Sequence, residues 1–197
     1  MDPRGTALGH HATHTLQFKP GSDVALLNAL LNVIVTEKLW NAKYVARHTE
    51  DFAVLRTHLE PFTPEAMAPL CGIDAATLRT IARVYAGADA AIIFWGMGIS
   101  QHVNGTDNVR CLIALATLTG QIGRPGTGLH PLRGQNNVQG ASDAGLIPKP
   151  TTSPTTEVSE VRAFEPTSPH HISMEPVPAR NCWKAVVPGS ALIWSAG

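Results

Sequence analysis

The chain has 197 residues, enough for one domain with its own core, and 44% of them are hydrophobic. Its 15 basic and 15 acidic residues balance, which argues against a protein that binds nucleic acid or an anionic membrane through charge. The longest apolar stretch, residues 24–35, is interrupted by Asn28 and Asn32 and is too short to cross a bilayer. We therefore expect no nucleic-acid partner and no membrane span.

The first elements in chain order are a strand end and a long helix. Residues 2–4 are typical of the end of a strand whose body would precede the chain. A turn at residues 20–21 leads to Ser22, which we expect to cap a helix that has Asp23 in its first turn. Residues 23–39 carry leucines at helical spacing and predict a helix that faces the core.

Shorter helices are predicted to follow. Residues 41–48 and 52–59 each have the length and pattern of a short helix. Thr63 is placed to cap another, with Pro64 at its first position, where a missing N–H is tolerated. Residues 74–85 have apolar side chains on one face and predict an amphipathic helix.

A strand and a loop are predicted next. The apolar run at residues 90–95 is typical of a buried parallel strand, and residues 96–98, Gly-Met-Gly, are typical of a ligand loop after it. Thr106 or Asp107 is expected to cap a helix over residues 108–119, after an Asn-Gly turn. This alternation predicts an α/β fold, an incomplete Rossmann-like layer of parallel strands with flanking helices.

The last stretch, residues 149–197, differs from the domain predicted over residues 1–148. It holds seven Pro and eleven Ser or Thr in 49 residues, with no sustained period of either kind. We expect a disordered tail, because too little apolar surface recurs to offset the entropy of ordering. A truncation with an unrelated or frame-shifted tail explains it most simply, and a flexible C-terminal linker is the alternative.

The cysteines and most histidines predict no metal site. Cys71, Cys111 and Cys182 form no Cys-x-x-Cys pair, so neither zinc nor an iron–sulfur cluster is indicated. We expect Cys71 and Cys111 to be buried among apolar neighbours. The histidines near the start lie in a β-branched setting where a four-residue spacing does not converge, namely His10, His11 and His14. His102 and His130 flank possible ligand loops and are better functional candidates.

An amide-rich segment, residues 133–141, is the most informative part of the chain. It contains Arg133, two Gln, two Asn and two Gly, after a Gly/Pro-rich approach at residues 120–128. Amides and glycines this dense make a poor helix or strand. Together with a guanidinium they suit a large polar ligand rich in heteroatoms. A polar surface loop, with Arg133 as a solvated cation, is the alternative.

Two aspartates are candidates for recognising a nucleotide base. Asp2 and residues 96–98 are each expected at the carboxyl end of a strand, where open α/β sheets bind ligands. The Asp2 carboxylate can accept from a ring N–H and an exocyclic amine, which guanine offers together, while the glycines allow a pyrophosphate to approach. Asp23 is a second candidate for the guanine end. The alternatives are a turn cap for Asp2, a helix charge for Asp23 and core filling for Met97.

Three motifs occur in order along the middle of the chain: Trp95-Gly-Met-Gly-Ile-Ser-Gln101, Leu118-Thr-Gly-Gln-Ile-Gly-Arg-Pro125 and Arg133-Gly-Gln-Asn-Asn-Val-Gln-Gly-Ala141. Together they resemble the molybdopterin oxidoreductases, specifically the formate dehydrogenase large (alpha) subunit. The resemblance covers about residues 2–148, as an internal fragment of that subunit. It implies molybdopterin guanine dinucleotide, two copies of which hold a molybdenum or tungsten ion.

The resemblance assigns residues to this cofactor. The positions expected to bind it are Asp2, Gly21, Asp23, Gly96, Met97, Gly98, Gln101, Arg133 and Gln135. The first three match nucleotide-binding positions, and the last two match positions near the pterin and the metal. Arg133 is also implied to be catalytic, orienting the formate carboxylate by bidentate pairing.

The implied function of the parent protein is oxidation of formate to carbon dioxide, with other formate dehydrogenase subunits as partners. A nitrate or arsenite enzyme is the runner-up; a non-enzymatic remnant and a free-standing pterin-binding module are alternatives of other classes. No segment of this chain corresponds to the metal-bound Cys or selenocysteine or to the iron–sulfur cysteines, so we expect no metal ligand and no activity of the chain alone. Analogy with the family favours the cytoplasm.

Overall fold

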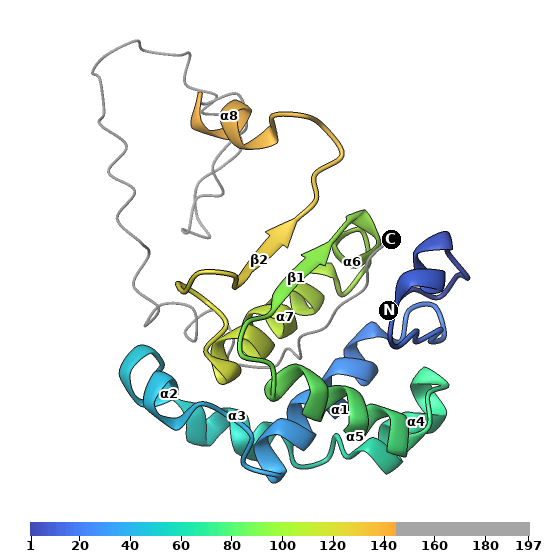
Figure 1. Ribbon diagram of the computed structural model, residues 1–197, viewed down its shortest axis with the longest axis vertical. Coiled ribbons are helices and arrows are strands. Elements are labelled where there is room, and N and C mark those ends of the chain that lie inside the picture. The colour runs from blue at the N-terminus through green and yellow to red at the C-terminus, as the bar shows by residue number, and fades with distance from the viewer. Residues whose placement is uncertain (145–197) are drawn as a thin grey trace, which may run out of the picture. The chain divides into compact units, whose positions relative to one another are not determined.

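The computed structural model describes residues 1–144, which fall into two units, Met1–Leu132 and a second that begins at Arg133 (Figure 1). Each unit is described by itself. The elements in chain order are a 3₁₀ helix η1 (Ala7–His11), α1 (Asp23–Thr36), α2 (Ala42–His48), α3 (Phe52–Leu59), α4 (Pro64–Cys71), α5 (Ala75–Ala86), β1 (Ile92–Trp95), α6 (Met97–Ser100), α7 (Gly105–Thr119), β2 (Gly128–Pro131) and α8 (Val138–Asp143). The tail predicted over residues 149–197 lies outside the described residues.

Helix α1 forms the centre of the first unit, and α3, α4, α5 and α7 pack against it. The apolar residues that predicted it are at most 3% exposed, namely Leu26, Leu27, Leu30, Leu31 and Ile34. Its polar residues are buried too, and the Asn32 amide donates to the carbonyl oxygen of Leu59 at 2.9 Å. The helix ends at Thr36 rather than at residue 39, because Lys38 takes a left-handed conformation with φ of 58°.

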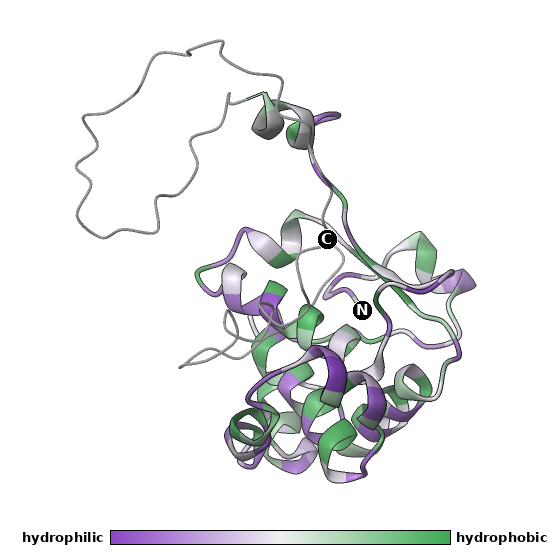
Figure 2. Ribbon diagram, turned by 90° about the vertical axis from the view of Figure 1, so that its left-hand side faces the viewer, coloured by the Kyte–Doolittle hydropathy of each residue, from purple (hydrophilic) through white to green (hydrophobic). Residues whose placement is uncertain are grey.

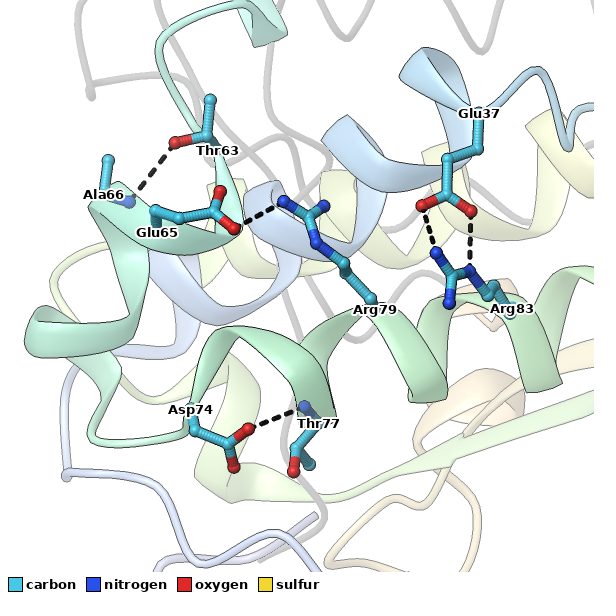
Figure 3. A network of polar contacts seen from close by, with 8 residues as sticks. All are labelled: Glu37, Thr63, Glu65, Ala66, Asp74, Thr77, Arg79 and Arg83. Atoms are coloured by element: carbon cyan, nitrogen blue, oxygen red, sulfur yellow. Dashed lines mark hydrogen bonds and ion pairs between the residues drawn. The ribbon is translucent and has the colours of Figure 1, made fainter.

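Side chains cap three of the shorter helices, and the cap at Thr63 is the one that the sequence predicted. Asn41, Thr63 and Asp74 each accept a hydrogen bond from the backbone N–H three residues later, at 3.0, 3.2 and 2.9 Å. Figure 3 shows the caps at Thr63 and Asp74. Ser22 stands at the N-cap of α1, but its hydroxyl donates back to the Lys19 carbonyl oxygen at 2.6 Å. Ser22 is thus the N-cap residue as predicted, but its side chain does not cap the helix.

Two ion pairs tie α5 to its neighbours (Figure 3). Arg83 donates from Nε and Nη2 to the two carboxylate oxygens of Glu37, just past α1, at 2.7 and 2.8 Å, and this holds the pKa of Glu37 below its usual range. Arg79 also forms an ion pair, from Nη2 to a single carboxylate oxygen of Glu65 in α4. Solvent screens exposed pairs of this kind, so they contribute little to stability.

The strands form a parallel pair, in register from Ile92 opposite Gly128 to Trp95 opposite Pro131. Helix α7 connects them, so β1, α7 and β2 make a β–α–β unit, the expected parallel strands with a flanking helix (Figure 1). Strand β2 was not predicted from the sequence. The larger Rossmann-like layer stays a prediction.

The two faces of β1 differ. Ile93 and Trp95 are 1% and 7% exposed, whereas Ile92 and Phe94 are 44% and 48% exposed. The strand is parallel as predicted, and the prediction that it is buried holds for Ile93 and Trp95 but is wrong for Ile92 and Phe94 within the described residues. Hydropathy colouring shows both apolar and polar bands on the surrounding helices (Figure 2).

Helix α7 begins three residues earlier than predicted. Asn104 stands at its N-cap, and neither Thr106 nor Asp107 caps it. The N–H of Gly105 bonds the His102 carbonyl oxygen at 2.9 Å, which confirms the Asn-Gly turn. A Cβ at Gly105 would lie 2.1 Å from the carbonyl oxygen of Ser100, so the helix can start here only with glycine.

The Gly/Pro-rich connection over residues 120–128 has a structural role. Gly120 ends α7 with a left-handed φ of 71°. The side chain of Gln121, 2% exposed, bonds two backbone groups at the entry to β1, at 3.1 and 2.9 Å. Arg124 donates to the carbonyl oxygen of Gly120 at 3.0 Å and to Gln121 Oε1 at 2.9 Å. These contacts tie the end of α7 to the start of β1.

The described part of the second unit contains one helix, α8. It overlaps residues 138–141 of the amide-rich segment, so the prediction that this segment forms neither helix nor strand is wrong for its last four residues. The Asn137 side chain accepts from the Gly140 N–H at 3.0 Å, and an amide acceptor in this position stabilises a helix start. Arg133 and Gln135 precede the helix and are exposed.

Candidate functional site

A pocket of about 300 Å³ opens beside the start of α1. Three separate parts of the first unit line it: the N-terminal segment, the turn before α1, and the segment that follows β1 (Figure 1). The polar and glycine residues among them are Asp2, Arg4, Gly21, Asp23, Gly98 and His102. Of the nine residues expected at a cofactor, the pocket thus brings four together: Asp2, Gly21, Asp23 and Gly98.

Asp23 is the buried acid of this pocket. It is the first residue of α1 and only 3% exposed. No hydrogen bond or ion pair reaches its carboxylate from any residue in the described range 1–144. The pocket is the open side from which a donor can approach this carboxylate. Asp23 is the acid in the first turn of α1, as its alternative interpretation had it, and it also lines the pocket, so its role at a cofactor stays a prediction.

The turn before α1 places Asp23 at the pocket. Lys19, Pro20, Gly21 and Ser22 form a tight turn in which the Ser22 N–H donates to the Lys19 carbonyl oxygen at 3.1 Å. Gly21 has φ of 78°, as the third residue of a type II turn after proline requires, and no atom lies within 4 Å of where its Cβ would stand. A larger residue at position 21 would strain the turn and fill open space at the pocket.

Asp2, by contrast, already has partners. Its Oδ1 accepts from the Arg4 backbone N–H at 2.8 Å and from Arg4 Nε at 3.2 Å, while Oδ2 accepts from Arg4 Nη2 at 3.3 Å. The side-chain hydrogen bond from Arg4 lowers the pKa of Asp2. Asp2 thus caps a turn around Pro3, as its alternative interpretation had it, and also lines the pocket with Arg4.

The segment after β1 is a helical turn and not an open loop, which corrects the prediction for residues 96–98. Gly96 is the N-cap of α6, and the Gln101 N–H donates to the Met97 carbonyl oxygen at 2.9 Å. Gly98 lines the pocket, whereas Gly96, Met97 and Gln101 belong to the same turn but do not line it. Met97 is 40% exposed, so it is not core filler.

A second pocket, of about 220 Å³, shares Gly21, Asp23 and His102 with the first. Its further lining includes Asn108 of α7, which is 1% exposed. Asn108 donates from Nδ2 to the carbonyl oxygen of Ile99 at 2.9 Å, and its Oδ1 has no partner within the described residues. The two pockets therefore adjoin along Asp23.

The remaining predicted site residues lie elsewhere. Arg133 and Gln135 belong to the second unit, so their roles stay predictions. His130 stacks on Phe94 in the strand pair, with ring centroids 5.2 Å apart, and does not line either pocket. His102 lines both pockets.

The findings on metals, cysteines and membranes apply to residues 1–144. No group of three or more His, Cys, Asp or Glu there is arranged to hold a metal ion, and His10 and His11 lie in η1. Cys71 and Cys111 are fully buried as predicted, and burial raises the pKa of the Cys111 thiol. No helix in this range is long and apolar enough to cross a membrane.

Sequence reasoning missed Arg4 and Asn108. Arg4 lies two residues after Asp2 in the sequence. This spacing of a cation and an acid is compatible with a local ion pair between them. Asn108 had been read only as the start of a helix. Its role depends on the contact between α1 and α7, which no local pattern shows.

Comparison with known proteins gives the family. A family model described as molybdopterin oxidoreductase matches residues 1–181, past residue 148. Formate dehydrogenase H of Escherichia coli (strain K12) is 45% identical over 147 residues, which cover 75% of this chain and 21% of that protein. The F420-dependent formate dehydrogenase subunit alpha of Methanocaldococcus jannaschii is 43% identical over 148 residues, covering 75% of this chain and 22% of that protein.

Two other proteins show how wide the likeness is. A nitrate reductase of Synechocystis is 38% identical over 145 residues, covering 74% of this chain and 20% of that protein. Among solved structures, the acetylene hydratase from Pelobacter acetylenicus superposes with a TM-score of 0.60 at 25% identity, over 64% of this chain and 17% of that one. The chain spans about a fifth of the length of the curated relatives it matches. The chain belongs to the molybdopterin oxidoreductase family, and formate dehydrogenase large subunits are among its relatives.

Proposed function

We propose that this chain is part of the catalytic subunit of a formate dehydrogenase and that its pocket beside α1 binds the guanine end of molybdopterin guanine dinucleotide. One observation supports this most: Asp2, Gly21, Asp23 and Gly98 come from distant parts of the chain and line one pocket. The resemblance had assigned each of them to the cofactor from sequence alone.

The chemistry of the pocket fits a guanine. Asp23 offers two carboxylate oxygens that only accept hydrogen bonds, and guanine offers a ring N–H and an amine on the same edge. A volume of about 300 Å³ is at the lower end for small-molecule sites, so it suits a nucleoside and not a whole dinucleotide. The pterin part would extend beyond the pocket, toward groups that this chain supplies elsewhere.

Arg133 and Gln135 are proposed to lie near the pterin and the metal. A bound molybdenum or tungsten centre would supply the acceptor for the two electrons and the proton that leave formate. Arg133 orients the formate carboxylate, since its guanidinium stays charged and presents two parallel donors. This role rests on the resemblance of the segment from Arg133 to Ala141.

The rest of the active enzyme is proposed to come from outside this chain. The chain spans about a fifth of its formate dehydrogenase relatives, which leaves room for the metal ligand, an iron–sulfur cluster and the remaining strands of a Rossmann-like layer. Other formate dehydrogenase subunits are the proposed partners, and the cytoplasm the proposed compartment.

The substrate assignment is tested with Arg133→Ala in a full-length polypeptide that contains this chain. We expect formate turnover to fall on the order of a hundredfold, because a misplaced substrate loses near-attack geometry, while molybdenum content changes less than about twofold. Arg47→Ala, at another exposed arginine, is the control and should alter neither. Equal loss of turnover and metal, or no loss of either, would contradict the role of Arg133.

The nucleotide assignment is tested with GMP and the 197-residue chain. Asp23→Asn should weaken GMP binding about tenfold or more, since it removes a charged acceptor. Asp107→Asn makes the same change in the first turn of α7 and should leave binding intact. GMP binding that ignores the Asp23 change would refute the proposed base site.

Nitrate reduction is the second candidate, favoured by the likeness to the Synechocystis enzyme. Assays of the full-length polypeptide with formate and with nitrate distinguish the two. Formate oxidation without nitrate reduction supports the first proposal, and the reverse replaces it.

A further inference from the structure

An unpartnered acceptor lies in the wall of the second pocket. Asn108 is 1% exposed, and its Nδ2 is engaged by the Ile99 carbonyl oxygen at 2.9 Å. That bond fixes which way the amide is turned, because a carbonyl oxygen can pair only with the NH₂ group. The atom without a partner among the described residues is therefore Oδ1, an acceptor.

A buried acceptor without a donor is a strong sign that something else supplies one. No group of residues 1–144 donates to Asn108 Oδ1, and the Asp23 side chain lines the same pocket. His102 and Val103, both exposed, form the outer part of this pocket and can yield to an entering group. The pocket thus presents acceptors and calls for a ligand edge that carries several N–H groups.

The number of acceptors selects among nucleobases. Asp23 supplies two oxygens and Asn108 one, and guanine presents three N–H bonds on one edge, one from the ring and two from the 2-amino group. Hypoxanthine keeps the ring N–H but lacks the amine. Adenine has a ring-nitrogen lone pair where guanine has its ring N–H, and this lone pair would be repelled by the Asp23 carboxylate.

We propose that Asn108 is a specificity-determining residue, which accepts a hydrogen bond from the 2-amino group while Asp23 holds the other two donors. The inference rests on the proposed guanine site and extends it. In this proposal a residue of α7 contacts the base directly and contributes to nucleotide specificity. The two adjoining pockets then form one binding site, with Asp23 in both of them.

The test compares GMP with IMP, which lacks the 2-amino group, on the 197-residue chain and on Asn108→Ala. The unchanged chain should bind GMP more than about tenfold more tightly than IMP, because IMP lacks both amino N–H donors, the one that Asn108 accepts and the one that Asp23 accepts. Asn108→Ala should weaken GMP about tenfold and IMP less than about twofold, so that the preference for GMP falls about tenfold and only the part due to Asp23 remains. A merely structural role for Asn108 would weaken both ligands by the same factor, and that result would overturn the proposal.

Two further variants keep the test decisive. Asn28→Ala changes an equally buried amide on α1 that also has one unpartnered atom but lines neither pocket, so the preference should persist. Asn108→Asp keeps an acceptor oxygen in place and should retain the ratio of GMP to IMP affinity; loss of that ratio would overturn the proposal even if Asn108→Ala fails to fold. Absence of GMP binding to the unchanged chain would refute the guanine site itself, whereas GMP binding with no preference over IMP refutes only the role of Asn108.

Discussion

The helices around α1 and the strand pair β1–β2 differ in how completely their apolar side chains are buried. Helix α1 is buried along most of its length, and α3, α4, α5 and α7 of this same chain pack against it. Strand β1 buries Ile93 and Trp95 against the helices but leaves Ile92 and Phe94 exposed. Parallel strands are ordinarily covered on both faces. The helical part is thus a complete packing unit, while the strand pair, within the described residues, is covered on one face.

The pocket lies where these two regions meet. Asp23 comes from the complete region, at the first turn of α1, and Gly98 and His102 come from the segment that follows β1. The acid is held firmly by a buried helix, and the opposite wall depends on the strand pair. Four predictions examine this contrast, beginning with the helical core.

The largest effect is expected from Leu31→Ala, in the middle of α1. Leu31 is fully buried, so the change should lower the free energy of unfolding by about 2–5 kcal/mol, through lost burial and a residual cavity. Urea unfolding of the 197-residue chain followed by circular dichroism measures it. A loss below about 1 kcal/mol would show that α1 is not the tightly packed centre of the unit.

Alkaline pH should weaken the same region through Tyr85 of α5. Burial raises the pKa of Tyr85 from 10.0 to about 12. Below pH 10 both states keep the proton; between pH 10 and about 12 the unfolded chain releases it and the folded chain does not, so stability falls by up to about 3 kcal/mol. Other groups titrate there too, so the signal is the difference from Tyr85→Phe. A phenylalanine variant with the same pH profile would contradict the assignment.

A smaller loss is expected where the helices join the strand pair. Gln121→Leu removes the side chain that bonds two backbone groups before β1 and also accepts from Arg124. Leaving these groups without partners should cost about 1–3 kcal/mol. Hydrogen exchange should show the loss locally, at amides of β1. If the amides of α1 and β1 lost their protection from exchange to the same extent, the two regions would unfold as one.

The smallest effect is expected on the open face of β1. Phe94→Ser changes a side chain that is 48% exposed and should alter the stability of this chain by about 0.5 kcal/mol or less. The same change in a full-length polypeptide should be several times more destabilising if further chain covers this face. Equal effects in both settings would remove the argument that the strand pair is incomplete.

The sequence predicted the helical region well, because its signals are local. Apolar spacing located α1 and α5, and the cap at Thr63 identified the start of α4. Errors arose where a backbone conformation or a close contact overrides the local pattern. Lys38 ends α1 in a left-handed conformation, and Gly105 starts α7 early because Ser100 lies against it.

The candidate site was predicted by resemblance and its geometry was not. Strand β2 has no local signal, since Gly128-Leu-His-Pro131 becomes a strand by pairing with β1. The sequence offers no reason to prefer Asp2 or Asp23 as the acid that binds a ligand. The structure shows that the Asp2 carboxylate accepts hydrogen bonds from Arg4, whereas the Asp23 carboxylate has no partner within the described residues. Asn108 lines a pocket with Asp23 only because α7 packs against α1, and the sequence does not show that contact.

The central claim is that one pocket beside α1 holds a guanine nucleotide, and NMR titration of the 197-residue chain with GMP tests it most directly. We predict that the backbone amide signals of Gly21, Asp23 and Gly98 shift together with one shared affinity, while those of α2 and α3 stay in place. Shifts elsewhere without these three, or different affinities for Gly21 and Gly98, would contradict it.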